Sequence, residues 1–272
     1  MPTEPLTFIS LFAGIGGFDL GLERAGMQCV AQVEIDDYAQ RVLAKHWPTV
    51  PRFRDVRSVG AHNLPHADLM CGGFPCQDIS IAGRRAGLTG ERSGLWGEFA
   101  RLIGELRPRY VLVENVSNLL SGERGAWMGA VLGDLAALGY DTEWQVLPAA
   151  AFGAPHERER LFLVAYPGGK SERRGIVFHT ANDISRNEQW RAAQGVASGR
   201  GWKRWLVQAC ADMDRAGHNP WFRGVADGLS CRLDKIRLKG LGNAVVPQVA
   251  EFVGRAIVAH ARAEAEQHKR AA

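Results

Sequence analysis

A cysteine in a glycine-rich turn is the strongest chemical signal in the sequence. Cys76 belongs to the segment GGFPCQ (72–77), so two glycines, a phenylalanine and a proline separate it from the apolar run that ends at Cys71. In α/β proteins the active site lies at the carboxyl ends of the strands, where such a turn would hold a small nucleophile. The alternative is a buried structural cysteine, a description that suits Cys71 better than Cys76.

A carboxylate and two arginines are predicted to face the same crevice. Glu114 begins the segment ENV, which ends an apolar run starting at Tyr110, so Glu114 should also stand at a strand end. Arg158 and Arg160 alternate in RERLF, and side chains two residues apart share one face of a strand. The alternatives are a capping role, which suits Asn115 better than Glu114, and a pair of exposed arginines.

A glycine-rich turn and two acids suggest a nucleotide-like ligand. The segment SLFAGIGGFDL (10–20) lies between a predicted strand and helix, where glycines let a ligand approach the backbone. Its GxGG spacing differs from the dinucleotide pattern GxGxxG. Glu34 ends the second predicted strand, where an acid can hold ribose hydroxyls, and Asp55 could accept a bond from an adenine amino group. The alternatives are a structural turn, a solvated carboxylate that starts the next helix, and an ordinary loop aspartate.

Alternating strands and helices must position these residues. The sequence predicts strands at 6–12, 29–34, 68–71, 110–113, 143–147 and 160–165, and helices at 18–25, 38–46, 94–106 and 126–138. Strands and helices that alternate at this spacing predict an α/β fold with a doubly wound, mostly parallel sheet.

The regular pattern stops after Tyr166 and returns near the end of the chain. A turn signal at 167–169 opens a stretch without clear periodicity, and helical spacing resumes at Pro247. We therefore predict a catalytic domain at 1–166, a small irregular lobe at 167–237, and a segment at 238–272 whose helix returns to the first domain.

The irregular stretch is basic and rich in tryptophan. Residues 167–240 hold 14 Lys and Arg against 7 Asp and Glu, whereas the whole chain has a net charge of only +4. Four of the eight tryptophans lie there: Trp190, Trp202, Trp205 and Trp221. Positive charge with interleaved aromatic rings suits a nucleic acid. The alternative is a solvated lobe with core tryptophans.

Composition excludes several classes of protein. Among 272 residues, 46% are hydrophobic and 23% charged, which is typical of a soluble globular protein. No apolar run approaches the roughly 18 residues of a transmembrane helix, and the first residues lack the pattern of a secretory signal. Five cysteines without CxxC spacing do not suggest a disulfide framework or a zinc site, so we expect a cytoplasmic protein and no metal.

In their order along the chain, these segments resemble the DNA (cytosine-5)-methyltransferases. The resemblance rests on SLFAGIGG, Glu34, Asp55, GGFPCQ, RSGLW (92–96), ENV, RERLF and GNAVVP (242–247), and it covers residues 6–166 and 238–258. It implies the class I fold of methyltransferases that use S-adenosylmethionine. It also implies transfer of a methyl group to C5 of a cytosine that is flipped out of duplex DNA.

The resemblance implies four catalytic residues. Cys76 would attack C6 of the cytosine as a thiolate and form a covalent adduct. Glu114 would bond to N3 and the exocyclic amine, and Arg160 would bind O2. Arg158 would help to hold a phosphate or the catalytic loop.

The resemblance also implies a site for S-adenosylmethionine. Glu34 would bind the ribose hydroxyls and Asp55 the adenine amine, with Ile35 and Val56 packed on the ring. The full implied set is Phe12, Ala13, Gly14, Gly16, Gly17, Glu34, Ile35, Asp55, Val56, Pro75, Leu95, Asn243 and Ala244.

Double-stranded DNA is the partner that the resemblance implies. A mobile loop from Gln77 to Trp96 would close over the target base. The candidate DNA contacts are Gln77, Ser80, Arg84, Arg85, Arg92, His156, Trp202, Lys203 and Arg204. His156 stands where the family usually has Gln, and the lobe at 167–237, which would read a short site, is small, as in compact phage or prophage members. We expect a monomer, paired with a cognate restriction endonuclease if it belongs to a restriction–modification system.

Three other functions would leave different signatures. A transfer RNA cytosine-5 methyltransferase of the same chemistry would carry a Cys-Phe-Thr motif, which the sequence lacks. A degenerate, non-catalytic nucleic-acid binder would have lost Cys76 or Glu114, and both are present. A dehydrogenase would need GxGxxG and would leave GGFPCQ and RERLF unexplained.

Overall fold

The computed structural model describes residues 4–75, 94–154, 158–168, 240 and 243–271. Cys76, the segment that follows it, and nearly all of the predicted lobe at 167–237 lie outside the described residues. Among the helices that are described, none is both long and apolar enough to cross a membrane.

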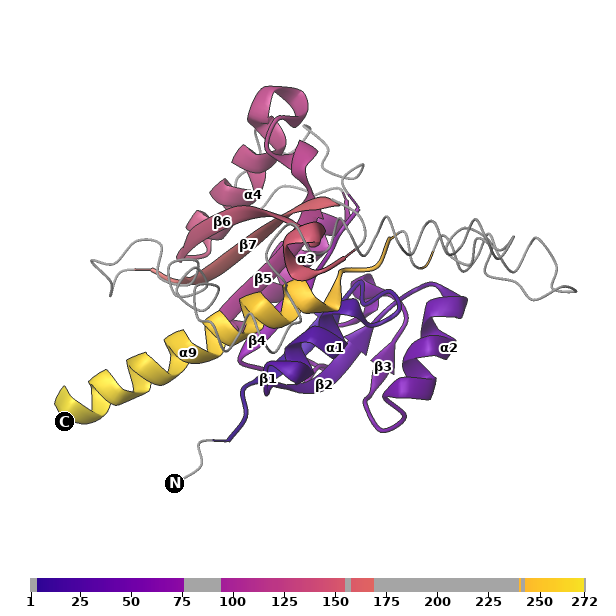
Figure 1. The fold of residues 1–272 in the computed structure, drawn as a ribbon, viewed down its shortest axis with the longest axis horizontal. Helices are drawn as coiled ribbons and strands as arrows, with labels where there is room; N and C mark the ends of the chain where they lie inside the picture. The colour runs from indigo at the N-terminus through magenta and orange to yellow at the C-terminus, as the bar shows by residue number, and fades with distance from the viewer. Residues whose placement is uncertain (1–3, 76–93, 155–157, 169–239, 241–242, 272) are drawn as a thin grey trace, which may run out of the picture.

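The described residues form a seven-stranded sheet (Figure 1). In spatial order its strands are β3 (Arg52–Phe53), β2 (Gln28–Val33), β1 (Thr7–Leu11), β4 (Leu69–Gly72), β5 (Tyr110–Val116), β7 (Glu159–Pro167) and β6 (Tyr140–Pro148). Neighbours from β3 to β5 pair in parallel, whereas β7 is antiparallel to both β5 and β6. The predicted α/β fold with a mostly parallel sheet is confirmed.

The antiparallel edge has a simple cause. Only the short helix η7 (Ala149–Phe152) is described between β6 and β7. Parallel pairing needs a long crossover connection, whereas a short link lets the chain turn back beside itself. The strand β7 then inserts between β5 and β6, so the last strand in sequence is not at the edge of the sheet.

Helices cover both faces of the sheet. The helices α1 (Gly17–Arg24) and α9 (Pro247–Ala271) lie together on one face, and α3 (Leu95–Leu106) and α4 (Ala126–Ala137) cover the other (Figure 1). Alternation along β5 serves both layers, because Tyr110 and Leu112 join the core beneath α1 and α9, while Val111 and Val113 join the core beneath α3.

The contact between α1 and α9 is very close. A Cβ atom at Gly21 would lie 2.5 Å from the Cβ of Ala250 and 2.8 Å from the backbone nitrogen of Glu251. A Cβ at Gly17 would meet the backbone of Val245. The absence of side chains on this face of α1 therefore lets the C-terminal segment pack directly against the first helix.

This packing gives a stability prediction. We expect Gly21→Ala to lower the free energy of unfolding by about 1–3 kcal/mol, because the new methyl group would force α1 and α9 apart. Gly129→Ala is the matched control: it lies in α4, is exposed, and its Cβ would meet nothing within 4 Å. The control should stabilise the protein by up to about 1 kcal/mol through helix propensity. Urea unfolding would measure both, and equal effects of the two substitutions would contradict the close contact.

Candidate active site

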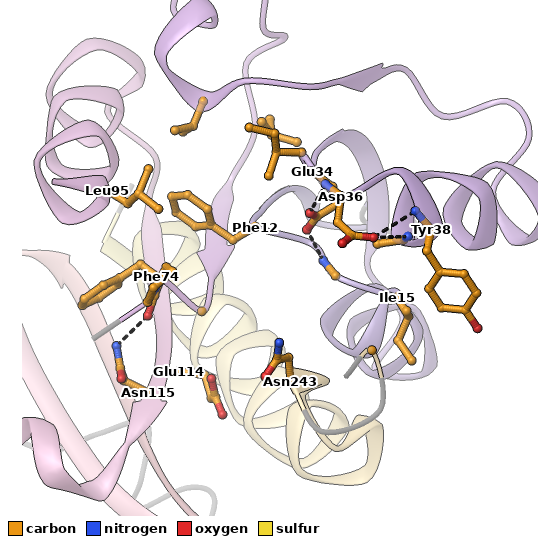
Figure 2. Close-up of a pocket in the computed structure, with 18 of the residues that line it drawn as sticks. Phe12, Ile15, Glu34, Asp36, Tyr38, Phe74, Leu95, Glu114, Asn115 and Asn243 are labelled. Atoms are coloured by element: carbon orange, nitrogen blue, oxygen red, sulfur yellow. Dashed lines mark hydrogen bonds between the residues drawn. The ribbon is translucent and has the colours of Figure 1, made fainter. Parts of the chain in front are cut away.

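A cavity of about 620 Å³ opens at the carboxyl ends of the parallel strands (Figure 2). Its walls come from the turns after β1, β2, β3 and β4, from the end of β5, and from the segment that precedes α9. The volume falls within the roughly 300–1,000 Å³ of small-molecule sites. Residues that are far apart in sequence meet here because the parallel strands all end at this edge.

Most of the predicted cofactor-binding residues line this cavity. They are Phe12, Gly14, Glu34, Ile35, Asp55, Val56, Pro75, Leu95 and Asn243. Glu114, Arg158 and Arg160 line it too. Cys76 and the predicted DNA contacts lie outside the described residues: Gln77, Ser80, Arg84, Arg85, Arg92, His156, Trp202, Lys203 and Arg204.

Four predicted cofactor residues do not line the cavity. Gly16 has a φ of 88°, and a Cβ there would meet the ring of Trp47. A glycine is therefore needed at this position for the turn and for the packing of Trp47. Gly17 faces the C-terminal segment instead. The other two are Ala13, whose N–H donates to the carbonyl of Val33, and Ala244.

Glu34 is held at the cavity edge by two backbone donors. One carboxylate oxygen accepts from the N–H of Gly14 at 2.7 Å and the other from the N–H of Asp36 at 2.8 Å (Figure 2). The helix α2 (Asp37–His46) is capped by Asp36, whose side chain accepts from the N–H groups of Tyr38 and Ala39. Asp36 is therefore the N-cap of α2, and this helix does not need the Glu34 carboxylate as its cap. Glu34 lines the cavity instead.

Two further residues line the cavity with Glu34: Asp55 contributes a second acid, and Ile35 contributes an apolar surface. Ile35 is 62% exposed and lines the cavity, so it presents an apolar surface there. Asp55 caps the short helix η1 (Val56–Ser58) and forms an ion pair with Arg57 at 2.8 Å. Hydrogen bonds from Arg57 lower the pKa of Asp55, so this carboxylate stays ionised.

Glu114 is a buried acid beside two cations. Its side chain makes an ion pair with Arg160, with 3.2 Å between Nε and Oε1, and the residue is only 7% exposed. Burial raises the pKa of Glu114 to about 6, although the positive charges of Arg160 and Arg158 oppose the shift. This carboxyl group can therefore exchange a proton near neutral pH.

Arg158 joins the start of β7 to the C-terminal segment. Its guanidinium donates to the carbonyl of Ala244 at 3.0 Å, across 86 positions of sequence. Arg158 precedes β7 and has a positive φ of 26°, a strained backbone for a residue with a side chain. Both Arg158 and Arg160 line the cavity. Because Arg158 precedes β7, however, the two arginines do not alternate along one strand as the sequence predicted.

Sequence reasoning missed several residues of the site. Tyr38, Arg57, Phe74 and Asn115 also line the cavity. The Asn115 side-chain amide donates to the carbonyl of Phe74 at 2.9 Å, so the end of β5 holds the turn that leads towards Cys76 (Figure 2). Asn115 belongs to the motif ENV, but the sequence suggested only a local capping role for this residue.

The buried carboxyl group predicts a pH-dependent stability. A pKa raised from 4.5 to about 6 means that ionised Glu114 destabilises the folded protein by about 2 kcal/mol. This penalty is absent below pH 4.5, develops as the pH rises to 6, and is complete above that. We therefore expect Glu114→Gln to stabilise the protein by about 2 kcal/mol at pH 8 and to have little effect at pH 4.5. Denaturant unfolding at both pH values would measure it, and a pH-independent difference would contradict the shifted pKa.

Comparison with known proteins identifies the family of the chain. Residues 6–199 match the family model of C-5 cytosine-specific DNA methylases. Over 161 residues the chain is 38% identical to the Type II methyltransferase M.HhaI of Haemophilus parahaemolyticus, which covers 59% of this chain and 49% of M.HhaI. Over 166 residues it is 36% identical to the Type II methyltransferase M.DsaV of Dactylococcopsis salina, covering 61% of this chain and 47% of the relative. The chain thus spans about half the length of the curated relatives it matches.

A solved structure shares the same fold. It is an Escherichia coli prophage protein assigned as a DNA modification methyltransferase, with a TM-score of 0.50 and 30% identity over 60% of this chain and 47% of that one. The family model covers well over half of the 272 residues. The chain therefore belongs to the family of C-5 cytosine-specific DNA methylases.

Proposed function

We propose that this protein is a DNA (cytosine-5)-methyltransferase that moves a methyl group from S-adenosylmethionine to C5 of a flipped-out cytosine. One observation carries the proposal. A single cavity is lined by Glu34, Ile35, Asp55, Glu114 and Arg160. Figure 2 shows Glu34 and Glu114 at different sides of this cavity. A donor and a target base bound in this cavity would lie next to each other.

The side of the cavity near Glu34 fits the adenosine part of the donor. Each oxygen of Glu34 accepts one backbone N–H and keeps capacity for a ribose hydroxyl. The exposed Ile35 offers an apolar surface to a ring, and Asp55 can accept from an amino group. When bound, S-adenosylmethionine supplies an electrophilic methyl group.

Cys76 and Glu114 would activate the cytosine together. C5 is a poor nucleophile, but addition of the Cys76 thiolate to C6 would raise the electron density at C5. Negative charge then builds at N3, where Glu114 can donate its proton because its pKa is near neutral. After methylation, loss of the C5 proton and elimination of the thiolate would restore the aromatic ring.

Arg160 would stabilise charge on the other edge of the base. Its guanidinium already lies 3.2 Å from Glu114, so it holds a cation beside the position proposed for the cytosine. Binding of O2 by this group would favour the adduct electrostatically. Arg158 is tied to the Ala244 carbonyl and would hold the C-terminal segment against the site.

The remaining features of the proposal concern DNA. A cytosine within a duplex is inaccessible, so the base must flip into the cavity. We assign the contacts with double-stranded DNA to the loop after Cys76 and to the basic lobe at 167–237. We further propose a cytoplasmic monomer with domains at 1–166, 167–237 and 238–272, and, because the relatives are Type II methyltransferases, a cognate restriction endonuclease as partner.

Two substitutions test the chemistry. Cys76→Ser should abolish methyl transfer, and Glu114→Gln should reduce it by roughly 10²–10⁴-fold, the usual contribution of a general acid. Both variants should still bind S-adenosylhomocysteine, because the residues proposed to bind its adenosine part, Glu34, Ile35 and Asp55, are unchanged in them. Transfer of labelled methyl groups to DNA and calorimetry would measure the two properties. Full activity in either variant would rule out the mechanism.

Bisulfite sequencing tests the substrate. Host DNA from cells that express this chain should contain protected cytosines in one short motif, and DNA from cells that express Cys76→Ser should not. Protected cytosines in total RNA but not in DNA would instead indicate a transfer RNA enzyme. Absence from both, in protein that binds S-adenosylhomocysteine, would indicate a non-catalytic binder.

A third test concerns the basic lobe. We expect the combined substitutions Trp202→Ala, Lys203→Ala and Arg204→Ala to weaken DNA binding and to leave S-adenosylhomocysteine binding unchanged. Loss of two phosphate contacts should reduce the salt dependence of log Kd by about 2. Arg24→Ala, an exposed arginine at the end of α1, is the control. Unchanged DNA affinity in the triple variant would show that this part of the lobe does not contact DNA.

A further inference from the structure

We propose that Arg57 is a positioning residue for recognition of the adenine ring, because it orients the Asp55 carboxylate towards the cavity. This inference rests on the proposed function, since it takes the adenine of S-adenosylmethionine as the group bound beside Asp55. Arg57 would not contact the reacting atoms. It would act only through Asp55.

The contacts between the two residues fix the carboxylate in one orientation. Oδ1 of Asp55 accepts from the Arg57 backbone N–H at 3.0 Å and from Nε at 2.9 Å. Oδ2 accepts from Nη2 at 2.8 Å and more weakly from Nε at 3.2 Å. Because Oδ1 already has two close donors, Oδ2 is the oxygen that can accept a further bond from an amino group.

Stability does not account for this pair. The side chains of Arg57 and Asp55 are 65% and 35% exposed, and ion pairs at such positions contribute little to folding. Both residues nevertheless line the cavity. The fork of an arginine restricts a carboxylate far more than a single donor would, which matters where the carboxylate must meet a ligand in a set direction.

The backbone around Asp55 is held by a different arginine. Arg101, on α3, donates to the carbonyls of Val56 and Val59 at 3.2 Å and 2.9 Å. Loss of the Arg57 side chain should therefore leave the loop in place and free only the Asp55 carboxylate. The nearby Arg54 cannot substitute for it without leaving Asp37, to which it is already paired.

The test compares two ligands that differ only in the adenine amino group. Calorimetry would measure the binding of S-adenosylhomocysteine, and of its analogue with hydrogen in place of that amino group, to the full chain and to its variants. For Arg57→Ala we expect a loss of roughly fivefold to twentyfold in affinity for S-adenosylhomocysteine, within the range of one charge-assisted hydrogen bond. Affinity for the analogue should change by less than about twofold, because it makes no bond to Asp55.

Three further variants calibrate the result. Asp55→Ala should remove the preference for the amino group completely and so define the largest effect. Arg57→Lys should recover part of that preference, because lysine keeps the charge but lacks the fork. Arg24→Ala should bind both ligands as the unmodified chain does.

The outcomes separate this inference from the proposed function. Failure of the unmodified chain to bind S-adenosylhomocysteine would overturn the proposed function, and this inference with it. If the unmodified chain binds, an unchanged preference in Arg57→Ala overturns the role of Arg57 alone. An equal loss for both ligands, or tighter binding of S-adenosylhomocysteine, would also overturn it, because Arg57 would then support or obstruct the cavity without orienting Asp55.

Discussion

The close packing of α1 against the C-terminal segment is the contact on which the cavity depends. Gly17 and Gly21 present no side chains on that face of α1, so the backbone around Val245 and Pro247 can lie directly on the helix. This approach brings Asn243 to the cavity wall and places the Ala244 carbonyl within reach of Arg158. The glycine face of α1 therefore holds the segment before α9 in place, and this segment in turn bonds to Arg158 just before β7.

Burial of Glu114 lowers the stability of the folded protein but gives the carboxyl group a pKa that suits proton transfer. A carboxyl group that is 7% exposed gives up hydration, and two nearby arginines only partly compensate, so its pKa rises to about 6. The fold therefore carries an acid that is costly to ionise yet able to hold a proton close to neutral pH. At an exposed position a glutamate keeps its ordinary pKa and would be ionised at neutral pH, without a proton to donate.

The acids on the other side of the cavity are arranged differently. Glu34 and Asp55 are not deeply buried, and each is fixed by hydrogen bonds. Glu34 accepts from two backbone N–H groups, and Asp55 accepts from the backbone N–H and the guanidinium of Arg57. Fixed acceptors suit recognition of a ligand, because less orientational freedom is lost on binding. In the proposed function, the buried Glu114 therefore exchanges a proton, whereas the less buried Glu34 and Asp55 recognise the ligand.

The sequence by itself determined the elements and the residues at their ends. Local apolar periodicity and the glycines and prolines of the turns specify where strands stop, so Glu34, Asp55 and Glu114 could be placed at strand ends and hence at one edge of the sheet. Cys76 was identified in the same way, from the motif GGFPCQ, of which Cys76 and Gln77 lie outside the described residues.

Only the tertiary structure decided which distant groups meet. The insertion of β7 between β5 and β6 sets Arg160 beside Glu114, and the return of α9 sets Ala244 beside Arg158. The sequence did not reveal that Gly17 serves packing or that Arg57 holds Asp55. Periodicity reports the backbone and burial of each segment alone, whereas these contacts depend on the orientation of side chains across segments that only the folded chain brings together.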